Sequence, residues 1–186
     1  GPNTGGMGAY SPAAIVSPAI FNEVMDTVIK TTVDAMQSEG ITYTGFLYAG
    51  LMIDDKGKVK VLEYNCRFGD PETQPIMMRL KSNLARLCIT ATQGALDSAK
   101  AEWDERTSLG VVMAANGYPE TYIKGEKIEI PDESLDYKIF HAGTKLEKEN
   151  IYSNGGRVLC ATALGADIKD AQKKAYDLIE KVKWEG

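Results

Sequence analysis

The sequence predicts an α+β protein, because helical and strand patterns occupy separate blocks along its 186 residues. Apolar residues recur at helical spacing within 17–40, 73–93 and 167–182. Two strand-like runs lie within 42–65, and from Ser108 onward short strands alternate with turns. This change of pattern predicts a domain boundary between residues 106 and 107.

The first part of the chain predicts a loop, a helix and a hairpin. Residues 1–11 form a glycine-rich loop without the lysine of a Walker A motif. Ser17 caps a helix that ends at Gly40. Strands over 42–53 and 58–65 follow, and the acidic turn between them makes them a hairpin.

The second helix is predicted as one element over 73–93. Asp70 stands at its N-cap and Pro71 at its first helical position. Its apolar stripe continues to Ala91, and Gly94 closes it. A polar connector over 97–107 leads to the second domain.

The last part of the chain predicts a small unit of strands with one final helix. Asn154-Gly155-Gly156 is a strong hairpin-turn signal, and Asp167 caps the helix. A lone histidine at a strand end, His141, is more often structural than catalytic. The strands are expected at 109–115, 127–130, 137–141 and 157–164.

Composition narrows the class of protein. The net charge of −5 argues against a general nucleic-acid or membrane-surface binder. No apolar run approaches membrane-spanning length. Cys66, Cys88 and Cys160 are an odd number without metal-type spacing, which favours reduced core thiols in a cytoplasmic protein over disulfides.

One strand end carries two oxygen donors. Side chains alternate along a strand, so Val59, Val61, Glu63 and Asn65 share a face, with the valines as its buried part. A carboxylate and a carboxamide two residues apart suit Mg²⁺, which takes few protein ligands. On spacing alone, Glu63 pairing with a lysine and Asn65 capping a turn is an open alternative.

Charged side chains of both signs follow directly after this strand. Arg67 offers a planar fork for phosphate or carboxylate, and Gly69 allows a tight turn. A helix start beside an arginine is a natural place for an anion. For Asp70 and Glu72 simple helix capping is the alternative, and it is compatible with a site.

The twelve residues Glu-Tyr-Asn-Cys-Arg-Phe-Gly-Asp-Pro-Glu-Thr-Gln, at 63–74, resemble the signature of the phosphoribosylamine–glycine ligases. These are ATP-grasp enzymes of purine biosynthesis, also called glycinamide ribonucleotide synthetases. Five further segments resemble the same family in the same order, and together they extend the resemblance over almost the whole chain. They lie at 1–12, 43–53, 109–114, 140–144 and 154–159.

The resemblance implies a fold and a place in a longer protein. Residues 1–106 would be the C-terminal half of an ATP-grasp core, and residues 107–186 a small mixed α/β C-terminal domain. A large N-terminal part and a short C-terminal piece would lie outside this sequence. Because no ATP-clamping lysine loop is present, the chain alone is expected to be inactive.

The resemblance also implies a reaction. The whole enzyme would join glycine to 5-phosphoribosylamine through a glycyl phosphate, with ATP as the phosphoryl donor and Mg²⁺ or Mn²⁺ as cofactor. Glu63 and Asn65 would hold the metal and the nucleotide phosphates. Arg67 and Asp70 would be catalytic, with Arg67 on the transferring phosphoryl group. Asp70 and Glu72 would bind the amino group of glycine or order the loop.

The glycine-rich segment is expected to line the substrate cleft through four residues. These are Thr4, Gly5, Gly6 and Gly8. On residue types alone, a plain flexible loop is the alternative for this segment.

The sequence departs from the wider ATP-grasp pattern at one strand. Many members carry an acidic metal ligand before the Glu-x-Asn pair, whereas residues 50–53 here are Gly-Leu-Met-Ile. Whether the site holds one metal ion or two therefore remains open. Two other functions also remain open, an ATP-grasp ligase related to biotin carboxylase and a non-catalytic binding domain.

Overall fold

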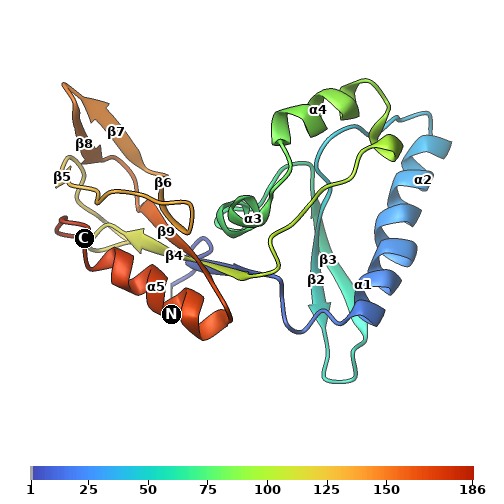
Figure 1. Cartoon of the computed structure of the whole chain (residues 1–186), viewed down its shortest axis with the longest axis horizontal. Helices are drawn as coiled ribbons and strands as arrows, with labels where there is room; N and C mark the ends of the chain where they lie inside the picture. Colours follow the sequence, from blue (N-terminus) through green and yellow to red (C-terminus); the bar gives the residue numbers. More distant parts are fainter. Residues whose placement is uncertain (1) are drawn as a thin grey trace. The chain divides into compact units, whose positions relative to one another are not determined.

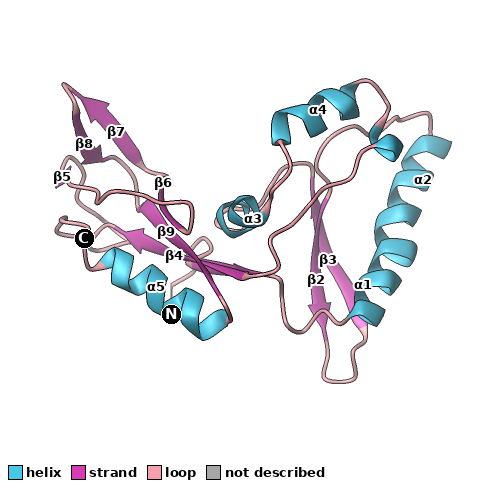
Figure 2. Ribbon diagram, in the orientation of Figure 1, coloured by secondary structure: helices cyan, strands magenta, loops and turns pink. Residues whose placement is uncertain are grey.

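The computed structural model describes residues 2–186, which divide into two compact units. Unit 1 contains residues 2–11, 70–81 and 103–186, and unit 2 contains residues 12–69 and 82–102. Figures 1 and 2 show the elements of both units. The units divide the chain differently from the boundary predicted at 106/107, because two early segments pack with the C-terminal part.

The core of unit 1 is an antiparallel sheet of four strands in the order β1-β4-β9-β6, of which Figure 2 labels β4, β9 and β6. The strand predicted at 137–141 is confirmed, and those predicted at 109–115 and 157–164 are confirmed within two residues at each end. The prediction of a loop over 1–11 is wrong at its end, because residues 8–11 pair with β4. The strands are β1 (Gly8–Ser11), β4 (Thr107–Ala114), β6 (Tyr137–His141) and β9 (Arg157–Gly165).

Two helices, α5 (Ile168–Ile179) and α3 (Thr73–Arg79), pack on strands β4 and β9. Leu159 and Ala161 of β9 form a buried cluster with Leu178 of α5. Cys160 and Thr162 alternate with them and face the other side, where Gly110 of β4 lies against Pro75 of α3. The sheet is therefore covered on both faces. Asp167 caps α5 as predicted, because its carboxylate accepts from the Asp170 amide.

A second, smaller sheet in unit 1 orders its strands β5-β8-β7. The sequence Asn154-Gly155-Gly156 does turn the chain, but the predicted hairpin there is wrong. The strand before the turn pairs with β5 and β7, whereas the strand after it belongs to the larger sheet. The strands are β5 (Lys127–Ile128), β7 (Thr144–Glu147) and β8 (Asn150–Ser153).

Unit 2 contains the predicted first helix and hairpin. One helical run extends through α1 (Pro18–Val24), the π-helical η1 (Met25–Lys30) and α2 (Thr31–Ser38). The Ser17 hydroxyl accepts from the Ile20 amide, so the predicted cap is confirmed. The hairpin is antiparallel, although its first strand begins later than predicted. Its strands are β2 (Tyr48–Ile53) and β3 (Val59–Asn65).

The single helix predicted over 73–93 is wrong. The chain leaves α3 at Leu80, where the backbone becomes extended and bridges to Trp103. A new helix, α4 (Leu84–Thr92), then begins in unit 2, because the Asn83 side chain accepts from the Arg86 amide. A short 3₁₀ turn, η2 (Leu96–Ser98), follows.

The three cysteines differ in their surroundings. Cys160 is buried, Cys88 is half-buried and Cys66 is exposed, so the expectation of three core thiols is wrong for Cys66. Cys66 lies outside the core because it follows the last residue of β3. Burial, with a smaller contribution from the negative charge of Asp70, raises the pKa of the Cys160 thiol to about 11.

Within residues 2–186, no helix combines the length and apolar character needed to cross a membrane.

An ion pair fixes the entry into β4. The Arg106 guanidinium donates to both carboxylate oxygens of Asp104, with its shortest contact 2.8 Å, and to Asp136 at 2.9 Å. Hydrogen bonds from the Arg106 side chain and amide lower the pKa of Asp104 to about 2. The Asp104 side chain is only 14% exposed, whereas that of Arg106 is 42% exposed. Solvent therefore screens part of the interaction.

We expect Asp104→Asn to lower the free energy of unfolding at pH 7 by about 1 kcal/mol, after allowance for that screening. The folded-state pKa lies below the ordinary carboxyl value of 3.8. The stabilisation is therefore complete above about pH 4 and is lost as the pH falls toward 2. Urea unfolding of the chain at pH 7 and pH 3 measures this.

Asp177→Asn is the matched control, because Asp177 forms an exposed pair with Lys173 on α5. We expect no measurable change from it at either pH. An Asp104→Asn effect of equal size at pH 7 and pH 3 would contradict the assignment to the carboxylate charge.

Candidate functional site

The predicted metal ligands lie side by side in unit 2 at the end of β3. Asn65 Nδ2 donates to Glu63 Oε1 at 3.2 Å, so the two side chains occupy the same face. The register shifts between Gly50 and Leu51, which pair with Glu63 and Val61. An added Cβ at Gly50 would lie 3.0 Å from Glu63 Cγ, so the absence of a side chain there leaves room for Glu63.

The two valines that precede this pair on β3 are less buried than predicted. Val59 is half-buried, but Val61 is 40% exposed, so the expectation that both valines form a buried face is wrong for Val61. The physical reason is the size of the sheet. In the part of the chain that the structure describes, β2 and β3 form a sheet of only two strands.

The donor set at the end of β3 fits a hard divalent cation. It offers a carboxylate and a carboxamide, and Mg²⁺ typically takes one or two carboxylates and leaves other positions to water and phosphate. The opposite strand, β2, carries no acidic residue. Among residues 2–186, no cluster of three or more His, Cys, Asp or Glu side chains has metal-binding geometry.

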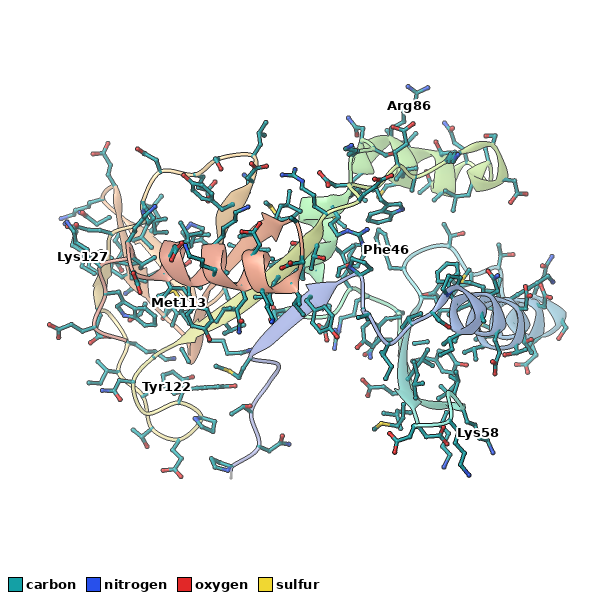
Figure 3. All side chains as sticks on the ribbon, turned by 60° about the horizontal axis from the view of Figure 1, so that its bottom comes forward. Phe46, Lys58, Arg86, Met113, Tyr122 and Lys127 are labelled. Atoms are coloured by element: carbon teal, nitrogen blue, oxygen red, sulfur yellow. The ribbon has the colours of Figure 1, made fainter. Side chains whose placement is uncertain are left out.

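Arg67 follows the pair on an exposed turn of unit 2. Its Nη1 donates to the Phe68 carbonyl at 2.9 Å. The Phe68 ring contacts Phe46, which precedes β2 in the sequence and is labelled in Figure 3, with 3.9 Å between the ring centroids. The aromatic contact and the Arg67 hydrogen bond both involve Phe68, and the Arg67 side chain is exposed.

Asp70 lies in unit 1, and the prediction that it caps a helix is wrong. Helix α3 begins at Thr73, its N-cap position is Glu72, and the half-buried Glu72 side chain makes no capping bond. The Asp70 carboxylate binds elsewhere. Its Oδ2 accepts from Arg157 Nη2 at 2.8 Å and its Oδ1 from Gln74 Nε2 at 3.1 Å. A long-range ion pair has therefore replaced the local cap.

The glycine-rich segment also belongs to unit 1, and two of its glycines lie close to residues of other segments. An added Cβ at Gly5 would lie 2.9 Å from Arg157 Cζ, and one at Gly6 would lie 2.6 Å from Pro71 Cδ. Thr4 is exposed, and Gly8 begins β1. The structure therefore brings Gly5 and Gly6 together with Asp70 through their shared neighbours Arg157 and Pro71.

Three polar side chains of this cluster were not predicted. Arg157 donates to Gly6 and Asp70, the Tyr118 hydroxyl accepts from the Gly5 amide at 3.0 Å, and Gln74 holds Asp70. Gln74 Oε1 is buried and makes no hydrogen bond among the described residues. The sequence signals for Arg157 are its place after an Asn-Gly-Gly turn and within the family-like segment 154–159, and neither names its partners.

Two family models match the chain. The phosphoribosylglycinamide synthetase ATP-grasp (A) domain matches residues 1–73, and the C domain of the same synthetase matches residues 108–186. The matches fall on either side of the boundary predicted at 106/107.

Two phosphoribosylamine–glycine ligases are similar to this chain along its whole length. The phosphoribosylamine–glycine ligase of Salmonella typhimurium is 58% identical over 189 residues, and that of Vibrio vulnificus is 57% identical over 188 residues. Each match covers 100% of this chain and 44% of the relative. The chain thus spans less than half the length of these relatives.

Two solved structures are also similar to this chain. The phosphoribosylamine–glycine ligase of Thermotoga maritima is 36% identical with a TM-score of 0.80, over 100% of this chain and 46% of that chain. The biotin carboxylase domain of Hydrogenobacter thermophilus 2-oxoglutarate carboxylase is 13% identical with a TM-score of 0.64, over 96% of this chain and 39% of that chain. The second likeness shows the fold alone. The chain therefore belongs to the phosphoribosylamine–glycine ligase family, with an α+β fold shared with ATP-grasp enzymes.

Proposed function

We propose that this chain is part of an ATP-dependent ligase that joins glycine to 5-phosphoribosylamine in purine biosynthesis. The observation that carries the proposal is the pair Glu63 and Asn65 on one face of β3, inside a stretch that resembles the family signature. The chain spans 44% of its relatives' length, so the activity would belong to a longer protein. A cytoplasmic location is part of the same proposal.

The proposed reaction has two steps. A carboxylate oxygen of glycine attacks the γ-phosphorus of ATP, the bond to the β-phosphate oxygen breaks, and ADP leaves with that electron pair. The amine nitrogen of phosphoribosylamine then attacks the carbonyl carbon of glycyl phosphate. Phosphate leaves with the electrons of the broken carbon–oxygen bond, and the amine loses a proton. The products are glycinamide ribonucleotide, ADP and phosphate.

We assign Glu63 and Asn65 to the cofactor, Mg²⁺ or Mn²⁺, through their side-chain oxygens. When bound, that ion would neutralise charge on the ATP phosphates. The exposed Arg67 donors suit the transferring phosphoryl group, where a fixed guanidinium stabilises developing negative charge. These roles rest on the donor types and on the placement of all three residues at the end of β3.

The assignment of Thr4, Gly5, Gly6, Gly8 and Glu72 to substrate binding stays a prediction, as does the catalytic role of Asp70. For Asp70, the hydrogen bonds that its carboxylate accepts from Arg157 and Gln74 support a role in ordering the loop.

The proposal is tested by ADP release from the full-length protein that contains this chain, with Mg²⁺ present. One reaction contains glycine and freshly made phosphoribosylamine, and a parallel reaction contains bicarbonate and biotin. We expect ADP only with the first pair. The 186-residue chain alone is the negative control and should release none, because no ATP-clamping lysine loop was identified in it.

ADP release only with bicarbonate and biotin would overturn the substrate assignment and leave ATP-grasp chemistry in place. No ADP with either pair would contradict the proposed ligase and favour a binding role.

We further expect Glu63→Gln in the full-length protein to lower kcat by about 100-fold or more, with a smaller change in the KM for glycine. The substitution removes a negative charge from the metal site while it keeps the side-chain volume. Steady-state kinetics over a range of Mg²⁺ concentrations measure the effect, and excess metal should restore part of the lost rate.

Asp55→Asn is the matched control, because it removes one acidic charge from the turn of the same hairpin. We expect kinetics within about twofold of the unchanged protein. An equal loss in both variants, or unchanged turnover in Glu63→Gln, would remove the metal assignment.

A further inference from the structure

Arg157 starts β9 in unit 1, and its backbone is fixed on two sides. It pairs with Ala114 of β4, and its carbonyl accepts from the Gly143 amide at 2.9 Å. The next residue, Val158, is fully buried in the core. The side chain is only 24% exposed, so the guanidinium begins from a rigid base and is largely shielded from water.

The guanidinium donates to three acceptors on two other segments. Arg157 Nη1 donates to the Gly6 carbonyl and to the Asp70 carbonyl, both at 2.9 Å, and Nη2 donates to Asp70 Oδ2 at 2.8 Å. These three bonds use the planar fork that distinguishes arginine from lysine. One side chain thereby fixes the glycine-rich segment against the Asp70-Pro71 turn.

The glycine-rich segment is held from a second direction. The Gly5 amide donates to the Tyr118 hydroxyl at 3.0 Å, while the Gly5 Cα faces the guanidinium of Arg157. A side chain at Gly5 or Gly6 would displace Arg157 or Pro71. The segment therefore has little freedom as long as the Arg157 contacts are made.

We propose that Arg157 is a positioning residue for the substrate site. It holds Gly5, Gly6 and Asp70 in the arrangement that admits the amino-bearing substrates, glycine and phosphoribosylamine. This inference rests on the proposed function, because it takes these segments as part of that site. The nucleotide phosphates are assigned to Glu63 and Asn65 of unit 2, so their binding does not depend on Arg157.

The test compares Arg157→Met and Arg157→Lys in the full-length protein. We expect Arg157→Met to raise the KM for glycine or for phosphoribosylamine by about 10- to 100-fold, as expected for a site misplaced by about 1 Å. The KM for ATP should stay within about twofold. Arg157→Lys should restore part of the loss, because it keeps the charge but cannot reach all three acceptors.

Arg106→Met is the matched control, because Arg106 in the same unit also joins separate segments, through Asp104 and Asp136. A merely structural loss would affect it similarly. A similar change of every KM in Arg157→Met and Arg106→Met would overturn the proposal. So would a rise in the KM for ATP as large as that for the amino-bearing substrates.

Hydrogen–deuterium exchange over residues 2–11 separates this proposal from the proposed function. We expect at least about tenfold faster exchange of this segment in Arg157→Met, with little change in Arg106→Met, because only the first loses the bond to the Gly6 carbonyl. If the unchanged protein showed no activity with glycine and phosphoribosylamine, the proposed function would fail. Exchange would still test whether Arg157 holds the glycine-rich segment in place. Unchanged exchange in Arg157→Met would show that it does not.

Discussion

The contact of the Arg157 guanidinium with the Gly6 carbonyl and the Asp70 carboxylate joins three segments that lie far apart in the sequence. Strand β9 supplies a rigid base for the arginine, because its neighbours β4 and β6 and the helix α5 bury it. The packing of the core thus determines the arrangement of an exposed polar cluster. The glycines at 5 and 6 complete the contact, since larger residues would displace the guanidinium or Pro71.

The functional stretch 63–74 is divided between the two compact units at Gly69 and Asp70. Before this division, Glu63 and Asn65 form an oxygen donor pair at the end of a hairpin strand, and Arg67 follows on a turn where Phe68 contacts Phe46. After it, Asp70 belongs to the cluster around Arg157. In the proposed function, phosphate binding rests on residues of unit 2 and the placement of the amino-bearing substrates rests on residues of unit 1.

Local patterns predicted the parts of the structure that depend on local physics. Alternation placed Glu63 and Asn65 on one face, and the Ser17 and Asp167 caps formed as residue type suggested. Predictions failed where distant residues decide the outcome. Residues 8–11, Gly-Ala-Tyr-Ser, contain a single strong strand former, and they form β1 by pairing with β4. Asp70 lies in a sequence typical of a helix cap, yet its carboxylate accepts a hydrogen bond from Arg157 of β9 instead. The break near Leu80 was hidden by a continuous apolar stripe, although Asn83 was a usable signal.

The most direct test of the Arg157 account is a double-mutant cycle with Asp70→Ala on kcat/KM for glycine in the full-length protein. If Arg157 acts largely through Asp70, removing both side chains should cost little more than removing Arg157 alone, with a coupling of about 1 kcal/mol or more. Losses that multiply, with no coupling between the two positions, would mean that the ion pair seen here does not position the site.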